Sequence, residues 1–374
     1  MMRNLGMVTT GSGCPKSKSM TMEDGVLKVA AAIKAKNPAA IVGMYWRTDM
    51  ALEIAECSNG TAELAKAGTA WFLKDDNGTL VKKGKSYLWD YENAAGKAFW
   101  TKTLLNVVQK TLPNGKPNLD YLYLDGPSWG NVPTISAARN AAIAAAKYTF
   151  HANLQRECDA LPGGGRNVIL NGCDNPATAA LFSSTGAAGT MFDHWSILQY
   201  TNRGADYGCN KNGTGPKGMC GTFNATAMDE AFALVRSKIL SNMTLQVKGW
   251  VGPVIKQQGH YPPQIPTPAT PAEQAIVAGE RFNSELALFL LVAEENTFWM
   301  FSWFWGFDSW VPGQADSQTP KGFYPQAKCQ LGAPKGPPVR KAGTVTYTRE
   351  YEHASVFVDL DHRNASKVDF KGTC

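Results

Sequence analysis

The strongest constraint on the fold is a regular alternation of short apolar runs with longer helical segments along the first 300 or so residues. Eight short runs predict β-strands, at Leu5–Thr9, Ile41–Trp46, Tyr87–Tyr91, Tyr121–Asp125, Asn167–Asn171, Thr190–Trp195, Leu245–Val251 and Phe298–Trp305. Several of these runs are apolar almost throughout, which is typical of strands buried on both faces of a parallel sheet.

Helical patterns lie between these runs, at Glu23–Lys36, Ala94–Lys110, Ile135–Ala160, Ala227–Leu240 and Ala272–Ala293. Eight strands alternating with helices is the count of a closed α/β barrel. The main alternative, a doubly wound open sheet, would be favoured by a glycine-rich phosphate loop after the first strand. The sequence has none there, and Gly163–Gly165 precedes a strand and indicates a helix stop. We therefore predict a (β/α)8 TIM barrel over residues 1–312.

The remaining residues, 313–374, predict a Pro/Gly-rich exit from the barrel followed by a small β-appendage. Thr344–Tyr351 and Ala354–Asp359 alternate polar and apolar side chains, as the two strands of a β-hairpin packed on the barrel would. Two insertions interrupt the barrel pattern, a Gly/Asn-rich segment at 201–222 and a Pro-rich segment at 259–271.

The cysteines indicate an oxidising compartment. There are eight, widely spaced and without a CxxC pair, so disulfides fit them better than a zinc ribbon or a thioredoxin-like site. The simplest connectivity joins neighbours: 14–57, 158–173, 209–220 and 329–374. Six glycosylation sequons, at Asn59, Asn77, Asn212, Asn224, Asn242 and Asn364, agree with secretion. The start of the sequence, MMRNLGMVTT, lacks the apolar core of a signal peptide, so either a preceding segment is missing or the start is processed.

Several functional classes have no support in the sequence. The net charge is +6, but the basic residues are scattered and form no stripe for nucleic acid. No apolar run approaches the roughly 20 residues that span a bilayer. The five histidines show no metal-ligand spacing, and there is neither a G-x-S-x-G elbow nor a Walker loop. We therefore expect a soluble monomer that uses no metal and no cofactor.

The polar residues that end the predicted strands point to carbohydrate chemistry, because the functional groups of a barrel gather at those ends. Carboxylates end three strands, at Asp90, Asp125 and Asp193. Further candidates for binding a substrate stand at strand ends or just beyond them: Trp46, Arg47, Trp129, Asn171, His194, Trp195, Trp303 and Trp305. Glycoside hydrolysis requires two carboxyl groups, and aromatic faces stack on sugar rings. The simpler alternative is that each aspartate caps a helix and each tryptophan packs in the core, as expected for Trp100.

Four segments carry a resemblance to a known group: FLKDDNG (72–78), YLWDYEN (87–93), YLYLDG (121–126) and TYTREYEHASVFVDL (346–360). They resemble glycoside hydrolase-like (β/α)8 proteins related to endo-α-1,4-polygalactosaminidases and, remotely, to α-galactosidases. The resemblance implies a nucleophile at the end of the fourth strand, Asp125, and an acid/base at the end of the sixth, Asp193. The polygalactosaminidase-like relatives would place Glu at position 193, whereas the Asp found there matches the α-galactosidase-like enzymes.

The sequence thus predicts a secreted glycoside hydrolase acting on a poly- or oligosaccharide by retention. In a retaining enzyme the two carboxyl groups lie roughly 5–5.5 Å apart, against roughly 6.5–9.5 Å for inversion. A catalytically inactive carbohydrate-binding barrel is the alternative. A third hypothesis, a lyase or aldolase, would need a buried lysine at the barrel mouth, and Lys248 is the strand-borne candidate.

Overall fold

The computed structural model describes residues 7–10, 20–51, 57–163, 165–173, 176–192, 225–237, 242–250, 271–302, 326, 329–360, 362 and 365–372. The chain divides into two compact units. The first, here called the amino-terminal unit, comprises Leu5–Met191 with Asn242–Thr244, and the second, the carboxy-terminal unit, comprises Met1–Asn4, Phe192–Ser241 and Leu245–Cys374. The predicted boundary at residues 312 and 313 lies outside the described residues and stays a prediction.

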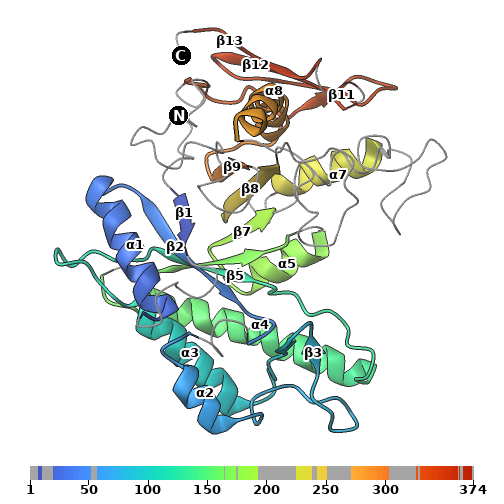
Figure 1. The fold of residues 1–374 in the computed structure, drawn as a ribbon. Coiled ribbons are helices and arrows are strands. Elements are labelled where there is room, and N and C mark those ends of the chain that lie inside the picture. The colour runs from blue at the N-terminus through green and yellow to red at the C-terminus, as the bar shows by residue number, and fades with distance from the viewer. Residues whose placement is uncertain are drawn as a thin grey trace. The chain divides into compact units, whose positions relative to one another are not determined.

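The amino-terminal unit is built on parallel strands in the order β1-β2-β5-β6-β7. These strands are β1 (Met7–Thr10), β2 (Ile41–Arg47), β5 (Tyr121–Asp125), β6 (Asn167–Asn171) and β7 (Gly189–Phe192). Helices α1 (Met22–Lys36), α3 (Ala94–Val108), α4 (Ala137–Asp159) and α5 (Pro176–Ser184) connect them (Figure 1). The predicted β/α alternation is therefore confirmed, and it brings the carboxyl ends of β2, β5 and β6 to one edge of the sheet.

The predicted strand Tyr87–Tyr91 is wrong. β2 pairs directly with β5, and the segment instead forms the short antiparallel hairpin of β3 (Lys82–Lys83) and β4 (Ser86–Tyr87) with bridges beyond it. The apolar run reflects burial rather than parallel pairing, because Trp89 is buried between Phe72 and Phe99. The described residues therefore supply one parallel strand fewer than the eight predicted.

The predicted helices are confirmed within a few residues at their ends. Thr21 caps α1, accepting a hydrogen bond from the backbone of Asp24, and Asn93 caps α3 in the same way. Such caps satisfy backbone N–H groups that have no partner inside a helix. Two shorter helices, α2 (Thr61–Ala67) and α5, had no prediction, because seven to nine residues are too few for a clear helical period.

The carboxy-terminal unit contains α7 (Ala225–Val235), α8 (Pro271–Leu290) and the parallel strands β8 (Thr244–Trp250) and β9 (Thr297–Ser302). The predicted terminal hairpin is confirmed as β11 (Thr346–Glu350) and β12 (Ala354–Asp359), which pair antiparallel. β10 (Val339–Arg340) and β13 (Lys367–Phe370) extend it to a four-stranded sheet. This sheet packs against α8 through β12 and β13.

The proposed 158–173 disulfide is wrong, since Cys158 and Cys173 are both buried thiols that form no disulfide. Cys158 lies in the last turn of α4, next to the start of β6, and Cys173 follows the end of β6. The two thiols therefore lie at opposite ends of a strand, too far apart for a disulfide, which needs Cα atoms within roughly 7 Å. Cys57 and Cys329 each form a disulfide, and the predicted pairings 14–57 and 329–374 stay predictions. The other four cysteines, at 14, 209, 220 and 374, lie outside the described residues.

No helix among the described residues is both long enough and apolar enough to cross a membrane.

Candidate active site

The site forms where β2 and β5 run side by side to the same edge. Their register pairs Tyr45 with Tyr123 and Arg47 with Asp125. Successive residues of a strand face opposite sides, and residues two apart face the same side, so Tyr45, Arg47 and Asp125 share one face of the sheet. Trp46 points to the other face, where it is only 4% exposed and packs edge-on against Trp100 of α3.

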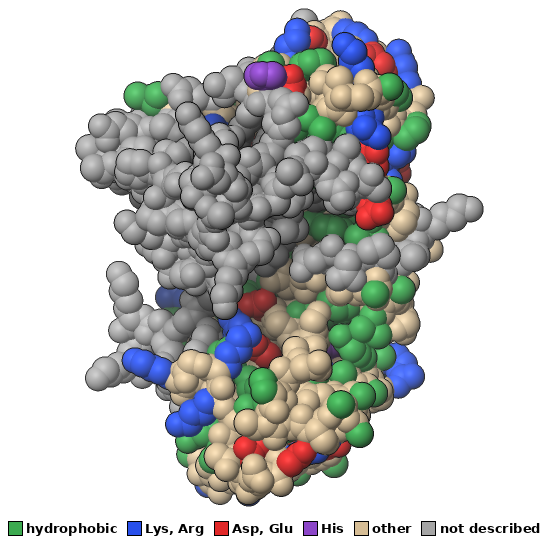
Figure 2. Space-filling view, turned by 90° about the vertical axis from the view of Figure 1, so that its right-hand side faces the viewer, with side chains coloured by type: hydrophobic (Ala, Val, Ile, Leu, Met, Phe, Trp, Pro, Cys, Tyr) green, Lys and Arg blue, Asp and Glu red, His purple; other side chains and the backbone are tan. Residues whose placement is uncertain are grey.

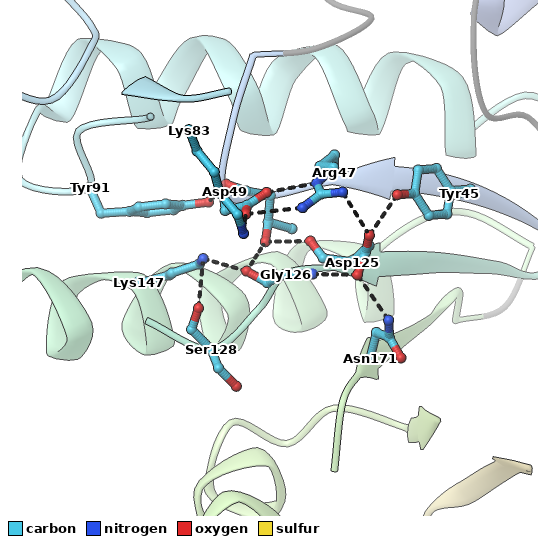
Figure 3. Close-up of polar contacts among 11 residues, drawn as sticks. Tyr45, Arg47, Asp49, Lys83, Tyr91, Asp125, Gly126, Ser128, Lys147 and Asn171 are labelled. Atoms are coloured by element: carbon cyan, nitrogen blue, oxygen red, sulfur yellow. Dashed lines mark hydrogen bonds and ion pairs between the residues drawn. The ribbon is translucent and has the colours of Figure 1, made fainter. Parts of the chain in front are cut away.

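The Asp125 carboxylate accepts contacts from donors on all sides of it (Figure 3). Tyr45 donates its hydroxyl to Oδ2 at 2.6 Å, and Nη1 of Arg47 lies 3.4 Å from the same oxygen. The backbone N–H of Gly126 and Nδ2 of Asn171 donate to Oδ1 at 2.8 and 2.9 Å. Both oxygens of Asp125 therefore act as hydrogen-bond acceptors, the role that either oxygen of a carboxylate can fill.

Asp49 holds the Arg47 side chain in place. Nε and Nη2 of Arg47 donate to the two Asp49 oxygens at 2.9 and 3.2 Å, and Nζ of Lys83 donates to Oδ2 at 2.8 Å. Burial alone would raise the pKa of Asp49, but the hydrogen bonds from Arg47 and Lys83 lower it below its ordinary value. Asp49 thus stays ionised and leaves the third nitrogen of Arg47 aimed at Asp125.

A tight turn follows Asp125. Gly126 has a φ of +66°, and a Cβ there would lie 2.8 Å from the carboxyl carbon of Asp49. Glycine adopts this positive φ without strain and has no Cβ to collide with Asp49, so it is the residue that fits here. The Gly126 carbonyl accepts hydrogen bonds from Oγ1 of Thr48 at 2.8 Å and from Nζ of Lys147 at 2.5 Å. The Gly126–Pro127 peptide, directly after the N–H that points at Asp125, is therefore held from two sides.

Lys147, on α4, is fully buried beneath this turn. Besides Gly126 it donates to the carbonyl of Ser128 at 3.3 Å, and its ammonium lies 5.3 Å from the centre of the Tyr91 ring. Burial lowers the pKa of Lys147 to about 7, although the nearby charge of Asp49 works in the opposite direction. A buried cation is thus placed under the candidate site with its charge sensitive to pH near neutrality.

This lowered pKa predicts a pH-dependent stability. In the unfolded chain Lys147 keeps its proton up to about pH 10.5, whereas in the folded chain it loses it near pH 7. Between these values the unfolded chain binds more protons, so the free energy of unfolding rises with pH. The buried charge of Lys147 therefore destabilises the folded chain fully below about pH 7. This destabilisation decreases above pH 7 and is gone once the pH has risen through 10.5.

The measurement is urea unfolding of the wild type and of Lys147→Met at several pH values. The wild type is expected to gain stability relative to the variant between pH 7 and 10, by at most about 1.4 kcal/mol per pH unit. The control is Lys110→Met, at an exposed lysine: it keeps Lys147, so its stability relative to the wild type should not change over this pH range. A constant difference between wild type and Lys147→Met across this range would contradict the prediction.

The structure brings only some of the sequence-predicted residues together. Arg47 and Asn171 contact Asp125 directly. Trp129 is half-buried in the loop after β5, where its indole N–H donates to Asn140 at 3.0 Å. Asp90 accepts a hydrogen bond from the Glu92 backbone at 2.9 Å, in the turn before α3. Asp90 therefore does not end a strand of the parallel sheet, and it does not cap α3 either, because Asn93 does so.

Trp46 is the clearest correction, since it lies in the core rather than at the mouth of the site. Five further candidates lie outside the described residues, and their roles stay predictions: Asp193, His194, Trp195, Trp303 and Trp305. The predicted separation of the Asp125 and Asp193 carboxyl groups therefore stays untested.

Sequence reasoning missed Tyr45, Asp49, Lys83 and Lys147. The sequence does contain a signal for Tyr45 and Asp49. They stand two residues before and two after Arg47, and residues two apart on a strand face the same side. Lys83 and Lys147 had none. Lys83 reaches the site from a separate hairpin, and Lys147 is an isolated lysine in an alanine-rich helix.

Lys248, the candidate for a Schiff base, is fully buried in β8. Burial lowers its pKa well below the ordinary value, and Glu285 of α8 opposes that shift. Its amine donates to the carbonyl of Gly249 at 3.1 Å. Lys248 thus lies against a helix that packs in the core. Across the described part of the chain, no group of three or more His, Cys, Asp or Glu side chains is arranged to hold a metal ion.

No protein-family model matches the chain, and no curated protein is similar to it in sequence. Solved structures of glycoside hydrolases show a distant likeness. An α-amylase from H. orenii has a TM-score of 0.47 at 10% identity, covering 79% of this chain and 59% of that one. The cyclic α-maltosyl-(1→6)-maltose hydrolase from Arthrobacter globiformis has a TM-score of 0.45 at 11% identity, covering 89% and 71%.

The galactosidase domain of the α-galactosidase–sucrose kinase AgaSK has a TM-score of 0.34 at 10% identity, covering 67% of this chain. This chain spans 34% of the length of that protein. With TM-scores below 0.5, these likenesses assign the chain to no family and to no activity.

Proposed function

We propose that this protein is a glycoside hydrolase that acts on a poly- or oligosaccharide with retention of configuration. The observation that carries the proposal is the Asp125 carboxylate, partly exposed at the end of a buried strand and held by donors from Tyr45, Arg47, Gly126 and Asn171. A nucleophile needs this combination of an ionised oxygen, a fixed direction and access to the substrate.

In the proposed mechanism, an oxygen of Asp125 attacks the anomeric carbon and forms a glycosyl ester as the bond to the leaving oxygen breaks. A second carboxyl group protonates the leaving oxygen. That group then takes a proton from water, whose oxygen attacks the same carbon and frees Asp125. We assign the second role to Asp193 on the sequence alone.

The donors around Asp125 have a separate role in this scheme. They orient one oxygen towards the substrate, and they stabilise the carboxylate again when the ester is hydrolysed. Tyr45 and Arg47 share Oδ2, while Gly126 and Asn171 share Oδ1. The side chain is therefore constrained through both oxygens.

The experiment has two parts. Polysaccharides and oligosaccharides are first screened for the release of reducing ends, and the anomer formed initially is identified by NMR. The protein is then incubated with a panel of activated fluorosugars, whose glycosyl-enzyme esters hydrolyse slowly. Mass spectrometry is expected to find a glycosyl group on the peptide that contains Asp125.

Initial formation of the inverted anomer would refute retention, and a label on another carboxylate would refute the role of Asp125. Binding of glycans without hydrolysis of any of them would favour the inactive carbohydrate-binding barrel.

Secretion is part of the proposal. Three of the six sequons fall on described residues, and the asparagines of all three, Asn59, Asn77 and Asn242, are exposed. Exposure is what attachment of a glycan requires.

A further inference from the structure

A basic surface lies beside the candidate site and takes no part in the proposed chemistry. It is the β3–β4 hairpin, residues 82–87, here called the lysine hairpin. Its side chains Lys82, Lys83 and Lys85 are all exposed, and no aspartate or glutamate occurs from residue 77 to residue 89. Figure 2 shows Lys and Arg side chains, in blue, at several places on the described surface.

The lysine hairpin is firmly attached. The ring of Tyr87 stacks on buried Phe72 with centroids 5.1 Å apart, and the Tyr87 carbonyl accepts a hydrogen bond from the Ala51 backbone at 3.1 Å. The Trp89 backbone donates to the Asp49 carbonyl at 3.2 Å. These contacts fix the hairpin to the segment that follows β2, so its backbone keeps a constant position relative to the site.

A chain of ion pairs links the hairpin to Asp125. Lys83 contacts Asp49 at 2.8 Å, Asp49 contacts Arg47 at 2.9 Å, and Arg47 contacts Asp125 at 3.4 Å. The distance between hairpin and site is therefore spanned by consecutive side chains. Lys83 thus places the hairpin that carries Lys82 and Lys85 directly beside the site.

The positive charge of the hairpin is only partly compensated. The single negative charge of Asp49 is shared between Arg47 and Lys83, so it compensates only one of these two positive charges. Among the described residues, neither Lys82 nor Lys85 forms an ion pair. Lys82 lies over the Tyr87 ring, with Nζ 4.7 Å from its centroid. Two cations on a rigid hairpin are thus free to bind an anion from outside.

We propose that the lysine hairpin binds an anionic group, a carboxylate or a sulfate, on the polysaccharide that is cleaved at Asp125. The inference rests on the proposed function and names its substrate class, an acidic glycan. Lys82 and Lys85 supply mobile point charges that suit either anion.

The test measures binding of the full chain to four polymers by affinity electrophoresis and calorimetry at low salt. Polygalacturonate supplies carboxylates, dextran sulfate supplies sulfates, pullulan is neutral, and a single-stranded DNA tests for a different class of polyanion. The wild type is compared with Lys82→Gln/Lys85→Gln. The matched control is Lys110→Gln/Lys116→Gln, which removes the same charge from exposed lysines ahead of β5, at the opposite edge of the sheet.

One acidic glycan is expected to bind at least tenfold more tightly than pullulan, and added salt should weaken that binding. The hairpin variant is expected to lose about tenfold in affinity, while the control keeps that of the wild type. The polymer that binds identifies the anion as a carboxylate or a sulfate.

Equal binding of pullulan, tighter binding of DNA, or equal losses in the two double variants would each overturn the inference. Turnover of neutral glycans alone would overturn it too, leaving the proposed function intact. Hairpin-dependent binding of an acidic glycan without turnover would instead refute the proposed function.

Discussion

Replacing Asp125 with asparagine is expected to lower the turnover of a glycan substrate by about a thousandfold or more, equivalent to about 4 kcal/mol of transition-state stabilisation. An amide keeps the shape of the carboxylate but is a far weaker nucleophile. The loss should appear in kcat, because the substitution removes a bond that forms only after the substrate has bound. Initial rates on the substrate found by screening measure this effect.

The asparagine variant also disturbs the hydrogen bonds of the site. The carboxylate accepts from Tyr45 and Arg47 on one oxygen and from Gly126 and Asn171 on the other, whereas an amide can accept on one side only. Some loss of stability is therefore expected. Thermal unfolding of the variant shows whether its inactivity arises at the site or from a failure to fold.

Chemical rescue separates the two explanations. Asp125→Gly opens space at the same position, and azide can then attack the anomeric carbon in place of the carboxylate. Azide is expected to restore turnover and to yield a glycosyl azide of inverted configuration. A folded Asp125→Gly variant that azide does not rescue, or one that retains wild-type turnover, would contradict the assignment.

The matched control lies at the other end of the same strand. Asp120, immediately before β5, contacts Lys34 at 2.7 Å and accepts the Val42 N–H at 2.7 Å. Asp120→Asn makes the same chemical change at the amino end of the strand. It is expected to lower the stability while leaving the kcat of the folded protein unchanged. Equal losses of kcat in Asp120→Asn and Asp125→Asn would show that the effect is not specific to the site.

The second large effect concerns the carboxy-terminal unit. Arg349→Met is expected to lower the free energy of unfolding of that unit by about 3 to 5 kcal/mol. Arg349 of β11 is buried and donates through Nη1 to the carbonyls of Leu290, Leu291 and Ala293 at 3.2, 3.1 and 2.9 Å. Its Nη2 lies 2.6 Å from Glu294. The terminal carbonyls of a helix have no partner within the helix, so Arg349 caps α8 from a neighbouring sheet.

Methionine keeps much of the apolar stem of Arg349 but leaves these carbonyls without a donor. Hydrogen exchange of the peptides covering 271–302, together with urea unfolding, measures the result. Arg340→Met on β10 is the control, because Arg340 pairs with Asp229 at the surface, and its loss is expected to stay within about 1 kcal/mol. Protection of α8 that is unchanged in Arg349→Met would contradict the capping role.

Local sequence patterns predicted the elements of this protein well but their pairing less well. The segment Tyr87–Tyr91 has the apolar character of a buried strand, yet its side chains are buried among Phe72 and Phe99 rather than within the parallel sheet. Periodicity reports which side chains are buried, and several arrangements of the chain can bury the same run. Trp46 illustrates the same limit, because a strand-end position alone does not tell which face of the strand meets the substrate.

The sequence by itself determined that the chain forms helices alternating with parallel strands, that residues 344–359 form a β-hairpin, and that Asp125 closes a buried strand. These features follow from local composition and from periods of two or 3.6 residues. Only the tertiary structure decided that Arg47 lies opposite Asp125, that Asp49 and Lys83 hold Arg47, and that Lys147 supports the turn at Gly126. Such partners are set by strand register and by the packing of distant segments, which bring together residues that no local pattern connects.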